Sequence, residues 1–279
     1  MAIITISRGT MSGGDALAAC LSAKLGYPSL SREVLVESAS KLGLSEEKLR
    51  WAISGSVHFW ERWHNERRLY LIALQAALAQ ECLSGNLIYH GNAGHLLLKG
   101  LPNLLRVRLI ATLEVRIRNL MEKEGMKYEA AKHYINCADK DRIEWTKFLY
   151  GVDWHDPELY DVVVNLEQIN LQAACSMIVG AVDLRRFKTT PNILKALADF
   201  ALGARVKLAL AANTEVRNVV FEVRADSGRV EILGETASAG VLVREMEPSQ
   251  EGIETIAKTV EGIREVIVNL HRIAKYPDS

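Results

Sequence analysis

The sequence predicts an α/β chain in two domains, and three observations lead to that prediction. Short apolar runs rich in β-branched residues alternate with longer helical patterns over the first 183 residues, which is typical of a parallel sheet with helices on both faces. After Asp183 the pattern changes to a shorter α-β-β-α-β order. The 279 residues, 49% of them hydrophobic, are enough to bury a core in one large or two smaller domains.

The first domain is predicted over residues 1–183. It opens with a strand over Ala2–Ile6, a glycine turn and a helix over Ala16–Leu25 that ends at Gly26. Strand, glycine turn and helix are the usual opening of an α/β unit. The later strands are predicted over residues 87–89, 105–111 and 162–164, and the helices between them over 57–83, 113–123, 127–148 and 171–182.

A basic linker over residues 184–195 is predicted to lead into a small α+β domain over residues 196–275. Its helix is expected over residues 193–211. Two strands over 216–223 and 230–233 flank the turn Ala225–Gly228, which is typical of a hairpin. A helix over 253–260 and a strand over 265–270 complete the pattern.

The formal net charge is zero, but that value is a cancellation between segments. The first 183 residues carry −1, the linker carries +4 and residues 196–279 carry −3. Zero net charge excludes a broad basic surface that coats nucleic acid, so no nucleic-acid partner is expected. The linker either faces water or contacts phosphate groups or the acidic domain.

The cysteines and the apolar segments bear on location. The four cysteines lie far apart with no C-x-x-C pair, which favours a reduced chain without a metal site of its own. The most apolar helical stretch, Leu69–Ala79, is shorter than the roughly 20 residues that span a bilayer. No signal peptide is visible in residues 1–14. A cytoplasmic protein without a transmembrane segment is expected.

The turn after the first strand is the first candidate site. Arg8 precedes it, and Ser12, Gly13 and Gly14 open the following helix. Exposed backbone N–H groups at a helix N-terminus attract phosphate. The turn lacks the lysine of the G-x-x-x-x-G-K-[ST] pattern, so by itself it is as consistent with a tight turn that binds nothing.

An ordered series of segments over residues 2–180 resembles the cytidylate-kinase-like family, a branch of the P-loop nucleoside monophosphate kinases. The segments are 4–8 with 12–14, 24–28, 87–93, 109–111 with 114–118, Ala131, 139–142, 153–154 and 160–165. The resemblance implies a P-loop kinase fold, a nucleotide substrate, and ATP with the Mg²⁺ that the nucleotide carries.

The resemblance also assigns roles to particular residues. It implies that the ATP phosphates lie on the turn 12–14, flanked by Arg8. Arg116 and Arg142 would be arginines of a lid over the phosphates, with Asp139 orienting that segment. Arginine suits this work because its planar guanidinium grips phosphate oxygens in pairs and stays charged. The alternative is that Arg116, Arg118 and Arg142 are helix-surface residues paired with Glu114, Glu122 and Asp139.

Several departures from the family pattern keep two functions open, among them Gly9 where a glutamate usually follows the arginine of the first turn and Ser31 where an aspartate commonly stands. Met11 stands where the family has a glycine, and Asn92 where relatives carry an arginine after Gly91. Loss of a phosphate-binding arginine costs orders of magnitude in phosphoryl-transfer rate. One hypothesis is an active kinase that transfers the ATP γ-phosphoryl group to a nucleoside monophosphate, CMP by resemblance. The other is a non-catalytic, nucleotide-sensing regulatory protein.

The insertion over residues 51–68 is rich in tryptophan and histidine. In a monophosphate kinase this region could stack on the base of the acceptor nucleotide. The alternative, favoured about three to one, is packing of the aromatic side chains into a core or a dimer interface, since aromatic residues recur at helical spacing.

Residues 200–273 resemble a BON domain. The resemblance depends on Val223, on the segment 228–234 and on apolar residues in 256–257, 260–263 and 266–270. It implies a module without catalytic residues that binds a protein partner, a small ligand or phospholipid. The −3 charge disfavours anionic lipid, so a protein or small-ligand partner is expected, and a homo-oligomer stays open.

Overall fold

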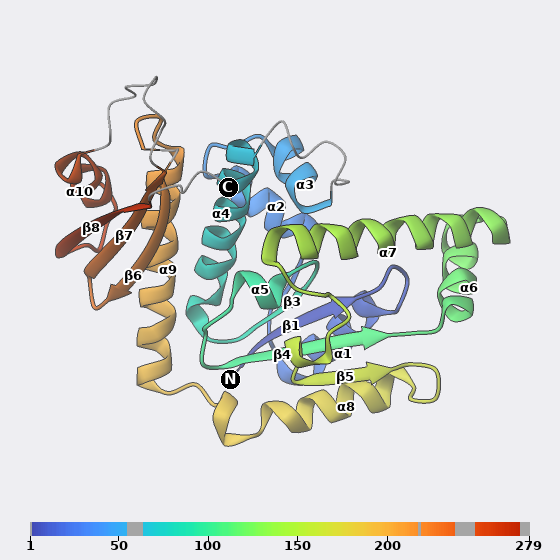
Figure 1. Cartoon of the computed structure of the whole chain (residues 1–279). Helices are drawn as coiled ribbons and strands as arrows, with labels where there is room; N and C mark the ends of the chain where they lie inside the picture. Colours follow the sequence, from blue (N-terminus) through green and yellow to red (C-terminus); the bar gives the residue numbers. More distant parts are fainter. Residues whose placement is uncertain (1, 55–63, 217–218, 238–248, 274–279) are drawn as a thin grey trace.

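The computed structural model describes residues 2–54, 64–216, 219–237 and 249–273 (Figure 1). The first domain is built on five parallel strands in the order β2-β3-β1-β4-β5. Their bounds are β1 Ile3–Arg8, β2 Ser29–Ser31, β3 Leu87–His90, β4 Leu104–Ile110 and β5 Val162–Asn165. The predicted parallel sheet is confirmed.

Helices cover both faces of this sheet, as the continuous apolar strands predict. One core lies between the sheet and α1 (Gly14–Leu25) and α8 (Leu171–Val182). The other lies between the sheet and α2 (Arg32–Ser40), α3 (Glu46–Ser54) and α4 (His64–Glu81). Buried isoleucines of β1 alternate between the two cores, with Ile3 in the second and Ile4 and Ile6 in the first.

Two helices extend from the carboxyl-terminal edge of the sheet. α6 (Leu113–Glu124) follows β4, turns at Gly125 and leads into the long α7 (Tyr128–Tyr150). Figure 1 shows α7 crossing above the ends of β1 and β4 and returning toward α4. The short α5 (Gly94–Leu97) follows β3. The ends of the central strands and α7 therefore surround one space.

The second domain has the predicted α-β-β-α-β order. α9 (Pro191–Ala212) precedes the antiparallel pair β6 (Val220–Asp226) and β7 (Arg229–Ala237), and β8 (Glu265–Ile273) pairs with β7 in parallel after α10 (Gln250–Lys258). The hairpin turns through Ser227 and Gly228 at φ of 52° and 87°, the left-handed region that glycine adopts readily. α9 and α10 cover one face of this sheet.

Helix α9 belongs to both domains. Ala201 and Ala204 pack against Ala76 and Ala79 of α4, while residues 202, 206 and 210 enter the core of the second domain. Two apolar faces on one helix join the domains side by side (Figure 1). No helix in the described ranges has the length and apolar character to cross a membrane.

The segment predicted as a basic linker is shorter and more structured than expected. α8 ends at Val182 and α9 begins at Pro191, with Thr190 accepting a hydrogen bond from the N–H of Ile193 as an N-cap. A single 3-10 turn, Arg185–Phe187, lies between them. Phe187 is buried in the core beside α8. Apolar contact and capping therefore attach much of this segment to the first domain.

Candidate functional site

The β1–α1 turn exposes backbone N–H groups. Gly13 stands at the N-cap of α1 with φ 87° and has no side chain to cap the helix. The first N–H groups of a helix have no partner inside it, and those of Gly14, Asp15 and Ala16 border a cleft. The backbone of Met11 adopts the left-handed region, with φ 62°, which a glycine adopts without strain. The Met11 side chain packs against the hydrophobic cluster between α6 and α7.

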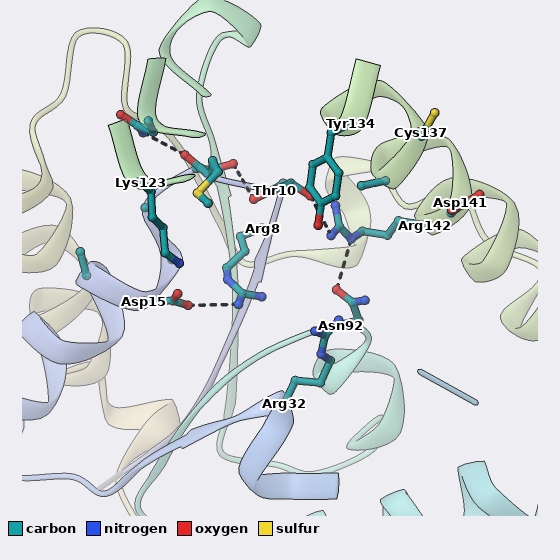
Figure 2. A pocket seen from close by; sticks show the side chains of 18 of the residues that line it. Arg8, Thr10, Asp15, Arg32, Asn92, Lys123, Tyr134, Cys137, Asp141 and Arg142 are labelled. Atoms are coloured by element: carbon teal, nitrogen blue, oxygen red, sulfur yellow. Dashed lines mark hydrogen bonds and ion pairs between the residues drawn. The ribbon is translucent and has the colours of Figure 1, made fainter. Parts of the chain in front are cut away.

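The cleft has a volume of about 680 Å³, within the range of small-molecule sites. It lies between the β1–α1 turn and the long α7, with α2 and α6 at its sides. Its lining is rich in cations, which Figure 2 shows directed into the shared space: Arg8, Arg32, Lys123 and Arg142. Four positive groups beside a helix N-terminus make this cleft attractive to a polyanion.

Arg8 lies directly over the glycine turn. A Cβ atom on Gly14 would collide with the Cδ of Arg8, so the side chain needs the glycine beneath it. Its Nη2 pairs with Asp15 Oδ1 at 3.0 Å, and His90 Nδ1 lies 3.1 Å from the same oxygen. The hydrogen bond with His90, together with the charge of Arg8, holds the pKa of Asp15 far below its usual range against the opposing effect of burial.

Arg116 and Arg142 are joined through one carboxylate. Asp139 lies 2.7 Å from Nη1 of Arg116 and 3.1 Å from Nη1 of Arg142. Arg116 also donates from Nε to the carbonyl oxygen of Thr10 at 2.7 Å. Arg116 is only 9% exposed, and it holds the turn in place through its bond to Thr10. Of the two arginines, Arg142 is the one that lines the cleft.

Arg142 is held on several sides. Its Nε donates to Asn92 Oδ1 at 3.2 Å, and its guanidinium carbon lies 5.1 Å from the ring centroid of Trp154. Burial lowers the pKa of Arg142 to about 10, with Asp139 opposing the change, so the side chain stays charged at neutral pH. Asn92 therefore supplies an acceptor that fixes Arg142, whereas an arginine at this position would repel it.

The structure brings most of the predicted site residues together. Arg8, Ser12, Gly13, Gly14 and Arg142 border the cleft. The Ser12 hydroxyl, however, donates to the carbonyl oxygen of Gly9 at 2.9 Å and is buried. The alternative prediction, helix-surface arginines paired with nearby acids, agrees with the structure in one respect, because Arg116 and Arg142 both pair with Asp139. Their side chains are nevertheless largely buried, whereas Arg118 is exposed.

The sequence reasoning did not single out several residues at the cleft. Arg32 comes from the start of α2 and Lys123 from the last turn of α6. The ring of Tyr134, half exposed on α7, lies beside Arg142 in Figure 2. The sequence does place Lys123 at the end of a predicted helix, but it cannot show which helix ends lie close together in the fold. The aromatic side chains of segment 51–68 lie outside the described residues.

Buried polar and aromatic side chains pack together around Trp154, which also contacts Arg142 of the cleft. The Trp154 ring lies 4.5 Å from the Arg108 guanidinium carbon, and its Nε1 donates to Ser7 Oγ at 2.8 Å. His95 lies nearby, 3% exposed, and neither ring nitrogen has a hydrogen-bond partner among the described residues. Burial, assisted by the charges of Arg106 and Arg108, lowers the pKa of His95 to about 4.

The parallel sheet, the glycine turn at the end of β1 and the cleft under α7 define an α/β domain with a candidate site for an anionic ligand at the carboxyl ends of its strands. A family model described as the cytidylate kinase-like family matches residues 3–168. The chain therefore belongs to the cytidylate kinase-like family. The match ends before α8 and leaves the second domain outside it.

Related proteins agree with this assignment. The chain is 28% identical over 196 residues to a cytidylate kinase of Thermoplasma acidophilum, covering 69% of this chain and 99% of that protein. It is 35% identical over 79 residues to a cytidylate kinase of Methanopyrus kandleri, covering 28% and 41%. An uncharacterized protein from Eubacterium ventriosum has the same fold, with a TM-score of 0.53 at 20% identity over 66% of this chain and 100% of that one.

Proposed function

We propose that the first domain transfers the γ-phosphoryl group of ATP to a nucleoside monophosphate of the CMP type. The observation that carries the proposal is Arg142, fixed by Asp139 and Asn92 at the cleft opposite the glycine turn. Phosphoryl transfer needs positioning and neutralisation of phosphate charge more than covalent chemistry from the protein. A preorganised, permanently charged guanidinium meets that need.

The residues present fit a triphosphate. The N–H groups of Gly14 and Asp15, with Arg8 above them, would hold phosphate oxygens at the helix N-terminus. Arg142 faces the same space from the other wall, while Arg116 keeps the turn in place through Thr10. ATP, with the Mg²⁺ it carries, supplies the phosphoryl group. The protein residues bind and orient it.

A coupled assay of ADP release tests the proposal. The full chain is incubated with ATP and Mg²⁺ and with CMP, dCMP, UMP or AMP, against a reaction without acceptor. We expect acceptor-dependent ADP release that is fastest with CMP or dCMP. A folded protein with no release above the acceptor-free rate at millimolar nucleotide would exclude the enzyme.

A non-catalytic nucleotide sensor is the second candidate. The pairing of Arg8 with Asp15 favours it, since this ion pair must open before Arg8 can hold a phosphate, which disfavours repeated binding and release of phosphate groups at the turn. Calorimetric titration with ATP·Mg²⁺ separates the cases. Binding without turnover supports the sensor, binding with turnover supports the kinase, and no binding excludes both.

We infer further that the second domain is a BON domain that binds a protein partner or a small ligand. Its α-β-β-α-β order and three-stranded mixed sheet support the assignment. Co-sedimentation with phosphatidylglycerol-containing vesicles tests the lipid alternative. Protein that stays in the supernatant agrees with the inference, and co-sedimentation that salt reverses would instead assign the domain to membranes.

A further inference from the structure

A second cavity, of about 390 Å³, lies where the two domains meet. We call it the junction groove. Its walls come from α4, α5, the carboxyl end of α7, α9 and β6. Figure 1 shows α4 and α9 side by side, with the end of α7 approaching α4. The groove is separate from the candidate phosphate cleft, and the two share no lining residue.

Two cations enter the junction groove from neighbouring helices. Arg68 of α4 and Lys207 of α9 are both half-buried. Burial lowers the pKa of both groups, and the charge of Arg68 lowers the pKa of Lys207 further. The carboxylate that acts on Lys207 belongs to Glu222, which is itself bonded to Arg224 at 2.8 Å. The described residues hold two like charges together here without a carboxylate that pairs with either.

The remainder of the junction groove is mostly apolar, apart from Gln75 and Tyr150, and it is partly open. Leu71 and Leu97 form part of it, and Phe148 and Val220 stand at its rim with 44% and 53% of their surfaces exposed. These rim residues come from different domains. An exposed apolar rim around a charged interior is typical of a ligand site rather than of a packed domain interface.

We propose that the junction groove binds a phosphate monoester that carries an aromatic or apolar body. Two converging cations match the near-dianionic charge of a monoester at neutral pH. The apolar rim matches the organic body. Two like charges in a half-buried site are unfavourable when it is empty, so such a ligand removes a repulsion as well as adding contacts.

Isothermal titration of the full chain with phenyl phosphate tests the proposal. Inorganic phosphate, which lacks the body, and benzamide, which lacks the charge, are titrated in parallel. We expect phenyl phosphate to bind more tightly than either. Lys207→Met and Arg68→Met are each expected to weaken this binding about tenfold, the loss of one charge-assisted hydrogen bond.

Control variants separate the junction groove from the cleft and from loss of folding. Arg142→Ala alters the cleft and should leave the Lys207-dependent binding in place. Lys207→Arg keeps the charge and should retain most of the affinity, and Arg229→Ala, which removes an exposed charge of β7 outside the groove, should leave the affinity unchanged. Equal affinity in the wild type and in folded Lys207→Met and Arg68→Met would overturn the proposal, as would loss of all binding in Arg142→Ala alone.

Discussion

The candidate cleft and the junction groove both gather cations, but they treat the charges differently. In the cleft, the one carboxylate of Asp139 bonds to both Arg116 and Arg142, and Asn92 accepts from Arg142, so these two guanidinium groups are held in place before any ligand arrives. In the junction groove, Arg68 and Lys207 line the same space, and no carboxylate of the described residues forms a salt bridge with either. The paired charges of the cleft fix the geometry of its side chains. The unpaired charges of the junction groove favour the binding of an anion.

His95 shows a third way to bury a titratable group. It has no partner among the described residues, yet it can lose its proton, and its pKa falls to about 4. An arginine cannot lose its proton in this way, because its pKa stays far above neutral pH even when it is buried. A buried arginine therefore keeps its charge and needs an acid, a backbone carbonyl or an aromatic face, as Arg108 has in Trp154, whereas a buried histidine can become neutral. Four predictions test this distinction, from the largest expected effect to the smallest.

Asp139→Asn should have the largest effect, because it leaves Arg116 and Arg142 buried without a counter-charge. We expect the free energy of unfolding to fall by about 4 kcal/mol, as for other broken buried pairs. Denaturant unfolding followed by circular dichroism measures this. Glu144→Gln on the same helix is the matched control, since its partner Lys140 is exposed and 3.8 Å away, and equal losses in both variants would refute the special role of Asp139.

His95→Leu should change how stability depends on pH. His95 has a pKa of about 4 in the folded state and about 6.5 when unfolded, so unfolding takes up a proton between these values. The wild type therefore loses stability as the pH falls from 6.5 to 4, by about 3 kcal/mol in total from this group.

In His95→Leu that loss should be missing, so the difference in unfolding free energy between variant and wild type shifts in favour of the variant by about 3 kcal/mol from pH 7 to pH 4. Urea titrations at a series of pH values measure it. The exposed His155→Gln is the control. Parallel pH curves for His95→Leu and the wild type would contradict a neutral buried His95.

Arg142→Ala removes the cleft's fixed cation. We expect ADP release, or ATP affinity if there is no turnover, to fall about 100-fold, or about 2.7 kcal/mol. Arg118→Ala, an exposed residue of α6, is the control and should change neither. If both variants keep wild-type turnover and affinity, the cleft is not the phosphate site.

Gly14→Ala should have the smallest effect. Its Cβ would displace Arg8 from the turn, and the loss of one positioned cation is expected to weaken ATP binding about tenfold, as measured by calorimetry. Gly180→Ala in α8 has open space around its Cβ and should bind ATP as the wild type does. An unchanged affinity in Gly14→Ala would mean that Arg8 does not contact the phosphates.

Much of the fold could be predicted from local patterns. The patterns over residues 87–89 and 171–182 predict a strand and a helix close to the observed bounds of β3, Leu87–His90, and α8, Leu171–Val182. β2 was missed because three residues, Ser29–Ser31, are too few to show a period. The linker was predicted too long, since Pro191 reads as a break in sequence but begins a helix at the position where proline is best tolerated.

The candidate site likewise contains residues that the sequence could identify and residues that only helix packing brings to the cleft. Arg8 and the glycines could be found from sequence because a phosphate turn is local, and the strand and helix beside it have clear patterns. Arg116 and Arg142 could be named only through resemblance, and their sharing of Asp139 depends on how α6 packs on α7. Lys123 and Tyr134 reach the cleft from the same helix pair.

The sequence by itself determined the two-domain order, the parallel sheet and the glycine turn after β1, because hydrophobic period and glycine placement act over a few residues. Only the tertiary structure decided which charges meet. Arg142 faces Asn92 across 50 residues, and α4 and α9 bring Arg68 to Lys207. Such pairings depend on helix packing between distant segments, which no local pattern records.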